Sequence, residues 1–246
     1  MKRVLVFIVF LSIGIRCFAE TAQIEKAIMM EDYSQAVYLA NRYLNDSPKE
    51  KDKILFLLGE AYIGSGNLVD ARETFRDIYK KFPDSVYAEK AVLKIADSYY
   101  LESNYLQAKK VYLYFLKNYP AAKFSSYAYL NLAYCDEKLG DWDSKKKDMR
   151  ILKGKYSSSI EAGKIEELDK RGYSFVIQVG AFLDKKNSRE LFRNLKKKGF
   201  DPYVVEDKEN GSRFFKVRVG RFDKREDAEA KREALLDKGF PARIFP

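Results

Sequence analysis

The sequence predicts two domains, an all-α solenoid of helical repeats followed by a small α+β domain with the element order βαββαβ. Two observations lead to this fold class. In residues 20–157, the features of helix pairs recur at steps of 35 and 37 residues. In residues 173–246, strand and helix patterns alternate as two half-copies of one unit. Residues 1–19 and 158–172 are expected to be a signal peptide and a linker helix.

Residues 1–19 have the parts of a secretory signal peptide. Lys2 and Arg3 form a positive start, and residues 4–15 form a mostly apolar run. This run is shorter than the roughly 20 residues that a helix needs to span a bilayer. Small residues before Glu20 then provide a cleavage site. We therefore expect an exported, periplasmic protein.

The same segment has two alternative interpretations. One is an uncleaved membrane anchor, and the other is lipid attachment at Cys17, where Arg16 occupies a position at which bacterial lipoproteins usually have a small residue. After cleavage Cys135 would be the one remaining cysteine, so no intramolecular disulfide is expected. Its apolar helical surroundings favour a buried and inert thiol.

Composition argues against several kinds of catalysis. The chain has no histidine, which is the commonest general base and metal ligand. Paired carboxylates such as Asp141 with Asp143 and Glu226 with Asp227 are interpreted as helix caps and surface charge. We therefore expect no catalytic residues, no cofactor and no metal. Net charge is close to zero in residues 20–171 but +6 in residues 172–246, which predicts an anionic partner for the C-terminal domain.

The repeats of residues 20–157 are defined by positions that recur along the chain. The turn positions of successive pairs are expected at Tyr33, Leu68, Tyr105 and Trp142. Small residues follow three positions later at Ala36, Ala71 and Ala108, whereas Lys145 interrupts this series. Prolines that would end the second helices stand at Pro48, Pro83 and Pro120. This pattern resembles the tetratricopeptide repeat, and the fourth repeat is interpreted as a degenerate terminal cap.

Stacked helix pairs leave a concave face, which usually binds a peptide or another protein. The pieces Phe82–Ala88 and Tyr119–Lys123 resemble repeats of the Tol-Pal-associated coordinator and of the outer-membrane assembly lipoprotein. The resemblance implies an unknown envelope protein as partner on the concave face. Aromatic residues are candidates for that face, although repeat packing explains each of them as well: Tyr62, Tyr99, Tyr100, Tyr112, Tyr114 and Tyr134.

The strands and helices of the C-terminal domain are predicted from the periodicity of its apolar residues. Four strands or short apolar segments are expected, over residues 173–182, 202–205, 214–222 and 241–245. A charged helix follows the first and third of these and ends at Gly199 or Gly239. Alternation predicts that one sheet face packs on the helices: Tyr173, Phe175, Ile177, Val179, Phe215, Val217 and Val219. The other face is expected to be open: Ser174, Val176, Gln178, Gly180, Phe214, Lys216, Arg218, Arg243 and Phe245.

The segment resembles the sporulation-related repeat (SPOR) domain. The matching motifs are the strand end Gln178–Phe182, the strand Phe215–Phe222, the helix-end glycines and the closing Ala242–Ile244. The resemblance implies an envelope domain that binds denuded septal peptidoglycan, meaning glycan strands without stem peptides. It also implies binding positions, which are matched here by Gln178, Ala181, Phe214, Lys216 and Arg243. Arg218 and Phe245 join them on the expected open face.

These residue types suit a bare glycan. Gln178 can donate to and accept from sugar hydroxyls, and Phe214 offers an apolar surface to a pyranose ring. The lactyl carboxylate of muramic acid, which is freed when the stem peptide is removed, is an anion for Lys216, Arg218 or Arg243. Solvated surface charge is the alternative explanation for the cations.

Three other functions were weighed. RNA-recognition modules also combine βαββαβ order with aromatic and cationic residues on an open sheet, but their third-strand motif is absent and export separates the protein from RNA, so we expect no nucleic acid as partner. A cell-wall hydrolase is disfavoured because nothing marks the carboxylate pairs as catalytic. The remaining alternative is an envelope-assembly scaffold whose C-terminal domain binds protein rather than glycan.

Overall fold

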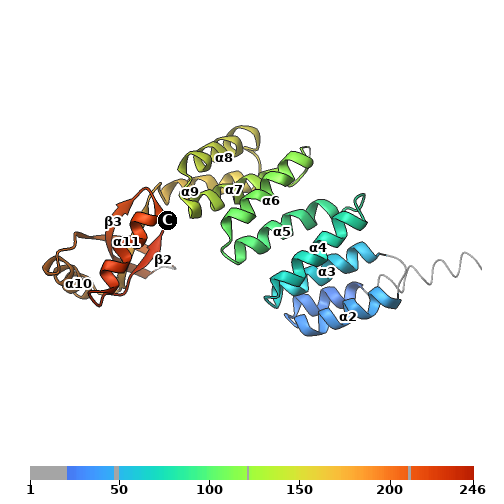
Figure 1. The fold of residues 1–246 in the computed structure, drawn as a ribbon, viewed down its shortest axis with the longest axis horizontal. Helices are drawn as coiled ribbons and strands as arrows, with labels where there is room; N and C mark the ends of the chain where they lie inside the picture. The colour runs from blue at the N-terminus through green and yellow to red at the C-terminus, as the bar shows by residue number, and fades with distance from the viewer. Residues whose placement is uncertain (1–20, 47–49, 121, 210–211) are drawn as a thin grey trace, which may run out of the picture. The chain divides into compact units, whose positions relative to one another are not determined.

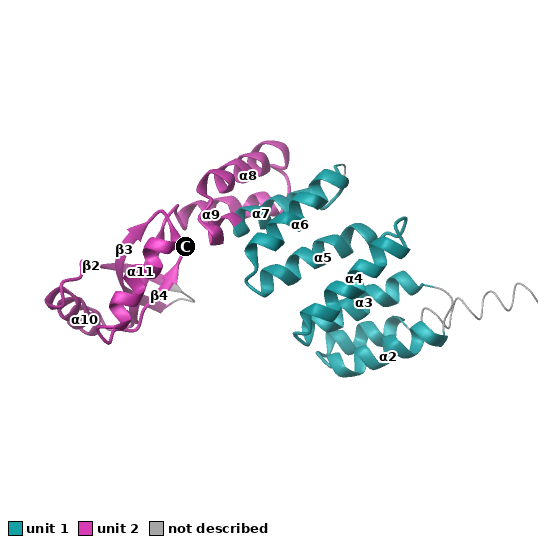
Figure 2. Ribbon diagram, in the orientation of Figure 1, with its two compact units in different colours: residues 1–135 teal, residues 136–246 magenta. Residues whose placement is uncertain are grey.

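The computed structural model describes residues 21–46, 50–120, 122–209 and 212–246. The predicted signal peptide, Cys17 and Pro48 lie outside the described residues. The chain divides into two compact units, residues 1–135 and 136–246 (Figure 2). The predicted fold class is confirmed, because a helical-repeat region precedes a small α/β domain with an antiparallel four-stranded sheet (Figure 1). In the described ranges no helix has the length and apolar character to cross a membrane.

The repeat region is a series of helices of similar length. A helix over residues 21–29 comes first. It is followed by α2 (Tyr33–Asp46), α3 (Lys51–Gly64), α4 (Leu68–Lys81), α5 (Ala88–Leu101), α6 (Tyr105–Asn118), α7 (Ser125–Leu139) and α8 (Trp142–Lys155). The second helices of the pairs begin at Tyr33, Leu68, Tyr105 and Trp142, which are the four residues that the sequence aligned as turn positions.

Each of these second helices is capped by the residue before it. The Asx side chain accepts a hydrogen bond from the backbone N–H three residues later at Asp32, Asn67, Asn104 and Asp141. Such a cap satisfies one of the helix N–H groups that have no partner within the helix. The caps recur at the same 35- and 37-residue steps as the helix starts, so they are part of the repeat, although the sequence analysis recognised only Asp141 as a possible cap.

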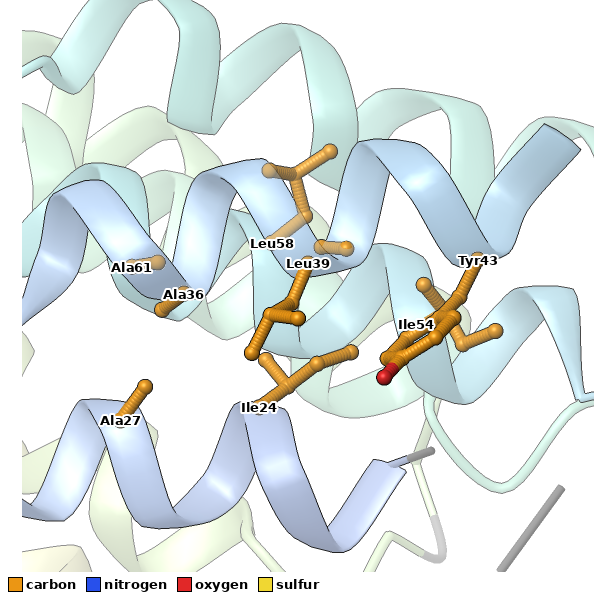
Figure 3. Packing of buried hydrophobic residues seen from close by; sticks show 9 residues of the cluster. Ile24, Ala27, Ala36, Leu39, Tyr43, Ile54, Leu58 and Ala61 are labelled. Atoms are coloured by element: carbon orange, nitrogen blue, oxygen red, sulfur yellow. The ribbon is translucent and has the colours of Figure 1, made fainter. Parts of the chain in front are cut away.

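Small residues allow the paired helices to approach closely. Ala36, Ala71 and Ala108 are all fully buried. Figure 3 shows this packing in the first repeat, where Ile24 of the first helix meets Leu39 of α2 among a cluster of buried apolar side chains. The packing explanation is confirmed for Tyr112, which lies in the core.

The third repeat contains a half-buried carboxylate. Asp97 of α5 accepts hydrogen bonds from Tyr112 Oη at 2.5 Å and from Tyr127 Oη at 2.9 Å. Burial raises the pKa of Asp97, and the two hydroxyl donors offset only part of that effect. The charged form is therefore less favoured in the folded protein than in the unfolded chain.

Asp97→Asn should change how stability depends on pH. A carboxyl with a raised folded-state pKa contributes stability below its unfolded pKa of about 3.9 and loses that contribution as the pH rises through the folded-state pKa. The melting temperature of the wild type, relative to that of the variant, should thus fall as the pH is raised from about 4. Thermal melts across this range measure the difference, and parallel curves would contradict the argument.

The fourth repeat differs from the others by a buried ion pair. Lys145, which replaces the small residue of the earlier repeats, is 0% exposed. Its Nζ donates to Glu137 Oε2 at 2.7 Å and to the Gly172 carbonyl at 2.9 Å. Arg171 approaches the other Glu137 oxygen at 3.4 Å. Lys145 therefore connects the end of α7 to the residues that precede the sheet.

Aromatic contacts strengthen this connection. The Trp142 ring lies 5.2 Å from the ring of Phe175, and its Nε1 donates to the Asp223 carbonyl at 2.9 Å. Tyr173 was expected in the first strand, but that strand begins at Phe175 and the Tyr173 hydroxyl donates to Asp169 instead. The sequence alone gave no indication that Trp142 would contact the first strand, because the two residues lie far apart in the chain.

Residues 158–172 form two short turns of helix rather than one continuous helix. A 3₁₀ turn, η1 (Glu161–Lys164), leads into α9 (Ile165–Lys170). Leu168 is fully buried, and both pieces pack on α8. The segment is thus ordered against the fourth repeat, within the same compact unit as the sheet.

Lys145→Ala should destabilise the residue 136–246 unit by about 3–5 kcal/mol, because it leaves the buried Glu137 carboxylate without its closest cation. Lys147→Ala is the matched control, since Lys147 is exposed on the same helix. Chemical denaturation monitored by Trp142 fluorescence measures both free energies of unfolding. Equal, small changes in the free energy of unfolding of the two variants would show that the buried pair does not stabilise the unit.

The α/β domain has the strand order β2-β3-β1-β4, and neighbouring strands are antiparallel. Its elements are β1 (Phe175–Phe182), α10 (Lys185–Lys197), β2 (Pro202–Glu209), β3 (Ser212–Phe222), α11 (Arg225–Leu236) and β4 (Arg243–Phe245). Leu195 of α10 and Leu235 of α11 join Ile177, Val179, Val217 and Val219 in one core. Both helices therefore cover the same sheet face, as the alternation predicted.

Candidate functional site

The sheet face away from the helices brings most of the predicted site residues together. Gln178 of β1 is paired with Arg218 of β3 on one side and with Arg243 of β4 on the other. Residues directly opposite each other in neighbouring strands share a face. The three side chains therefore form a line across three strands, with the amide between two guanidinium groups.

A β-bulge places Ala181 on this face. Simple alternation from Val179 would put Ala181 on the helix side. The register of β1 against β3 shifts between Gln178 and Gly180, so that Ala181 is opposite Lys216. The expected open position of Gly180 is wrong for the same reason, because a Cβ at Gly180 would lie 2.8 Å from Leu191 of α10.

Lys216 is not a free cation. It is 8% exposed, and its Nζ donates to Asp207 Oδ2 of β2 at 2.7 Å. This hydrogen bond lowers the pKa of Asp207, with a further contribution from the charge of Arg218. The sequence analysis expected three cations to be available to an anion, but the structure leaves two, because β2 supplies an internal carboxylate.

The residues that sequence reasoning missed come from β2. The strand is longer than the expected apolar segment 202–205, and Tyr203, Val205 and Asp207 are opposite Arg218, Lys216 and Phe214. Their alternation with Val204 and Glu206 was visible in the sequence and would have placed them on the open face. Tyr203 extends the line of Arg218 and Gln178 onto a fourth strand.

The two arginines differ from Lys216 in their surroundings. Among the described residues, neither Arg218 nor Arg243 has an ion-pair partner, and Nε of Arg218 is buried without a hydrogen-bond acceptor. The guanidinium of Arg243 lies 5.2 Å from the ring of Phe245. Val176, opposite Phe245, is buried rather than openly presented. The face thus offers two cations, an amide and aromatic rings to a ligand.

Two family models match the chain. Residues 172–243 match the SPOR domain, and residues 53–153 match the family described as outer membrane lipoprotein (YfiO). The resemblances to the SPOR domain and to the repeats of the outer-membrane lipoprotein are therefore confirmed over these residues, and the resemblance to the Tol-Pal-associated coordinator stays a prediction. No curated protein matches the chain.

Solved structures add comparisons of fold. The apo form of RapI is 15% identical, with a TM-score of 0.53, over 73% of this chain and 68% of that one. A tetratricopeptide repeat protein from Parabacteroides merdae is 18% identical, with a TM-score of 0.47, over 61% of this chain and 58% of that one. The peptidoglycan-binding domain of the B. subtilis cell wall lytic enzyme CwlC is 29% identical, with a TM-score of 0.26, over 30% of this chain and 90% of that one.

The fold and the family matches together define a class of protein. The chain combines tetratricopeptide-like helical repeats, part of which matches an outer-membrane lipoprotein family, with a C-terminal domain that matches the SPOR domain. The structure adds the open sheet face, on which Gln178 lies between two arginines.

Gln178→Glu should weaken binding of an anionic ligand, because the new carboxylate would lie between Arg218 and Arg243 and neutralise them. The fold should survive, since Gln178 is half-buried on the open face. Val217→Ala, in the core below, should instead reduce stability by roughly 1–3 kcal/mol. Thermal melts and binding assays on both variants separate the two effects. Unfolding by Gln178→Glu with a silent Val217→Ala would invert the assignment of the faces.

Proposed function

We propose that this chain is a non-enzymatic, periplasmic peptidoglycan-binding protein that acts in cell division or envelope maintenance. Residues 173–246 recognise denuded glycan strands, and residues 20–157 recruit a protein partner. The observation that carries the first part is the line of Arg218, Gln178 and Arg243 on the open face of a domain that matches the SPOR family.

The chemistry of the line explains a preference for denuded strands. In intact peptidoglycan the lactyl group of muramic acid is bonded to the stem peptide as an amide. Removal of the peptide exposes a carboxylate, which an arginine can bind with two parallel hydrogen bonds. Neither Arg218 nor Arg243 forms an ion pair among the described residues, and Gln178 between them can satisfy sugar hydroxyls or acetamido groups.

The proposed protein-binding role of the repeats is supported by a cleft of about 580 Å³ between α3 and α4. Its apolar part comes from Leu55, Leu58 and Tyr62, and its polar wall combines acidic and basic residues of α4: Asp70, Glu73, Arg76, Asp77 and Lys80. Such a cleft suits a peptide that carries both apolar and charged side chains. The match to an outer-membrane lipoprotein family supports an envelope protein as the partner.

The scaffold alternative assigns the C-terminal domain a protein ligand instead. A carboxylate side chain of a partner could also bind between Arg218 and Arg243, so glycan binding must be measured directly. Purified protein without residues 1–19 should bind amidase-treated sacculi more tightly than untreated sacculi, because amidase exposes the lactyl carboxylates. Sedimentation with increasing protein measures both affinities.

Arg218→Gln and Arg243→Gln should each remove much of the difference between the two preparations, whereas Arg213→Gln, outside the line, is the matched control. Equal binding of the wild type to both preparations, or no binding to either, would favour a scaffold function over recognition of denuded glycan.

A further inference from the structure

The net positive charge of the C-terminal domain lies on one helix, because the positive and negative residues of the remainder are equal in number. Residues 185–198 contain seven Lys and Arg but a single Glu, whereas the rest of residues 172–246 contains eleven basic and eleven acidic residues. The entire net charge of +6 is therefore carried by α10 and its C-terminal cap. The charge that the sequence analysis attributed to an anionic glycan lies on the opposite side of the sheet.

The cations of α10 form a stripe along its exposed surface, which begins at Lys185 near the ring of Phe215. Lys185, Arg189, Arg193 and Lys197 follow one another at four-residue intervals, which places them side by side along the helix. Lys186 and Lys196 flank them, and all six are exposed. Lys196 has a carboxylate contact, to Asp201 at 3.5 Å, and within the described residues the other five have none. The buried Ser188 and Leu195 lie on the side that faces the sheet.

The fold does not require this stripe. The second half-copy of the domain packs α11 on the same sheet face with three basic and four acidic residues, so the helix layer is compatible with a neutral surface. Like charges at four-residue spacing destabilise a helix. The stripe therefore opposes folding locally, which indicates a role in binding.

Apolar side chains border the stripe and indicate the kind of partner. Leu183, two residues before the start of α10, is exposed over 67% of its surface. The half-buried ring of Phe192 has Lys196 Nζ 5.8 Å from its centre. Cations together with exposed aliphatic and aromatic groups suit the boundary between lipid headgroups and acyl chains. A soluble polyanion, by contrast, has no apolar region that Leu183 could contact.

We propose that the outward face of α10 binds the surface of an anionic phospholipid membrane. Because α10 lies on the helix side of the sheet and Arg218, Gln178 and Arg243 lie on the open side, membrane and glycan would occupy separate surfaces of one domain. The inference does not depend on the glycan function, since it rests on different residues.

The test is sedimentation of the protein without residues 1–19 with phosphatidylethanolamine vesicles that contain or lack phosphatidylglycerol. The wild type should bind only the anionic vesicles. The triple variant Lys186→Gln/Arg189→Gln/Arg193→Gln should bind them about a hundredfold more weakly, because each basic residue near an anionic surface contributes about fivefold. Leu183→Ser should also weaken binding to the vesicles.

The matched control is Lys208→Gln/Lys224→Gln/Lys238→Gln, which removes the same charge from exposed positions outside α10. The affinity of this control variant for the anionic vesicles should fall by less than about tenfold. Equal losses in the two triple variants, or no binding of the wild type to anionic vesicles, would overturn the proposal. So would an α10 variant that keeps vesicle binding but loses amidase-treated sacculi, because the stripe would then serve the glycan. Circular dichroism verifies that both triple variants are folded.

Discussion

The pairing of β1 with both β3 and β4 is the constraint on which the chemistry of the C-terminal domain depends. It places Arg218 and Arg243 on either side of Gln178. The register is held by burial, because Ile177 and Val219 must stay beneath the two helices. A slip of one residue would exchange the two faces of a strand, exposing the apolar core and burying the charged line.

The β-bulge in β1 shows how a small irregularity decides the composition of a site. It brings Ala181 to the open face beside Lys216 and turns Gly180 toward α10. On the neighbouring strand, Asp207 forms an ion pair with Lys216. The face is thus less cationic than a count of its lysines and arginines implies, and its free positive charge is concentrated on the two arginines.

The fourth repeat packs differently from the three before it. Where they have a buried alanine, it has Lys145 in a buried pair with Glu137, and a buried pair of this kind costs desolvation energy that an alanine would not. Together with the contact between Trp142 and Phe175, it joins α8 to the start of the sheet within one compact unit. The repeat pattern in the sequence extends to about residue 157. Packing, however, groups the last repeat helix, α8, with the α/β domain.

The sequence by itself determined the element types, the repeat positions and the helix-covered face of the sheet. These follow from local periodicity, since Tyr33, Leu68 and Tyr105 begin helices for reasons of nearby spacing and capping, and Ile177 and Val179 alternate within one strand. The sequence also located Gln178, Arg218 and Arg243 on one face, because alternation alone separates them from the core.

Only the tertiary structure decided which of these groups are available to a ligand and where the charge lies. The Lys216–Asp207 pair, the place of Ala181 and the burial of Lys145 each depend on a residue from another strand or helix, whose distance along the chain gives no local pattern. The net charge of the C-terminal domain could be counted from the sequence, but its separation from the open face required knowing that α10 lies on the other side of the sheet.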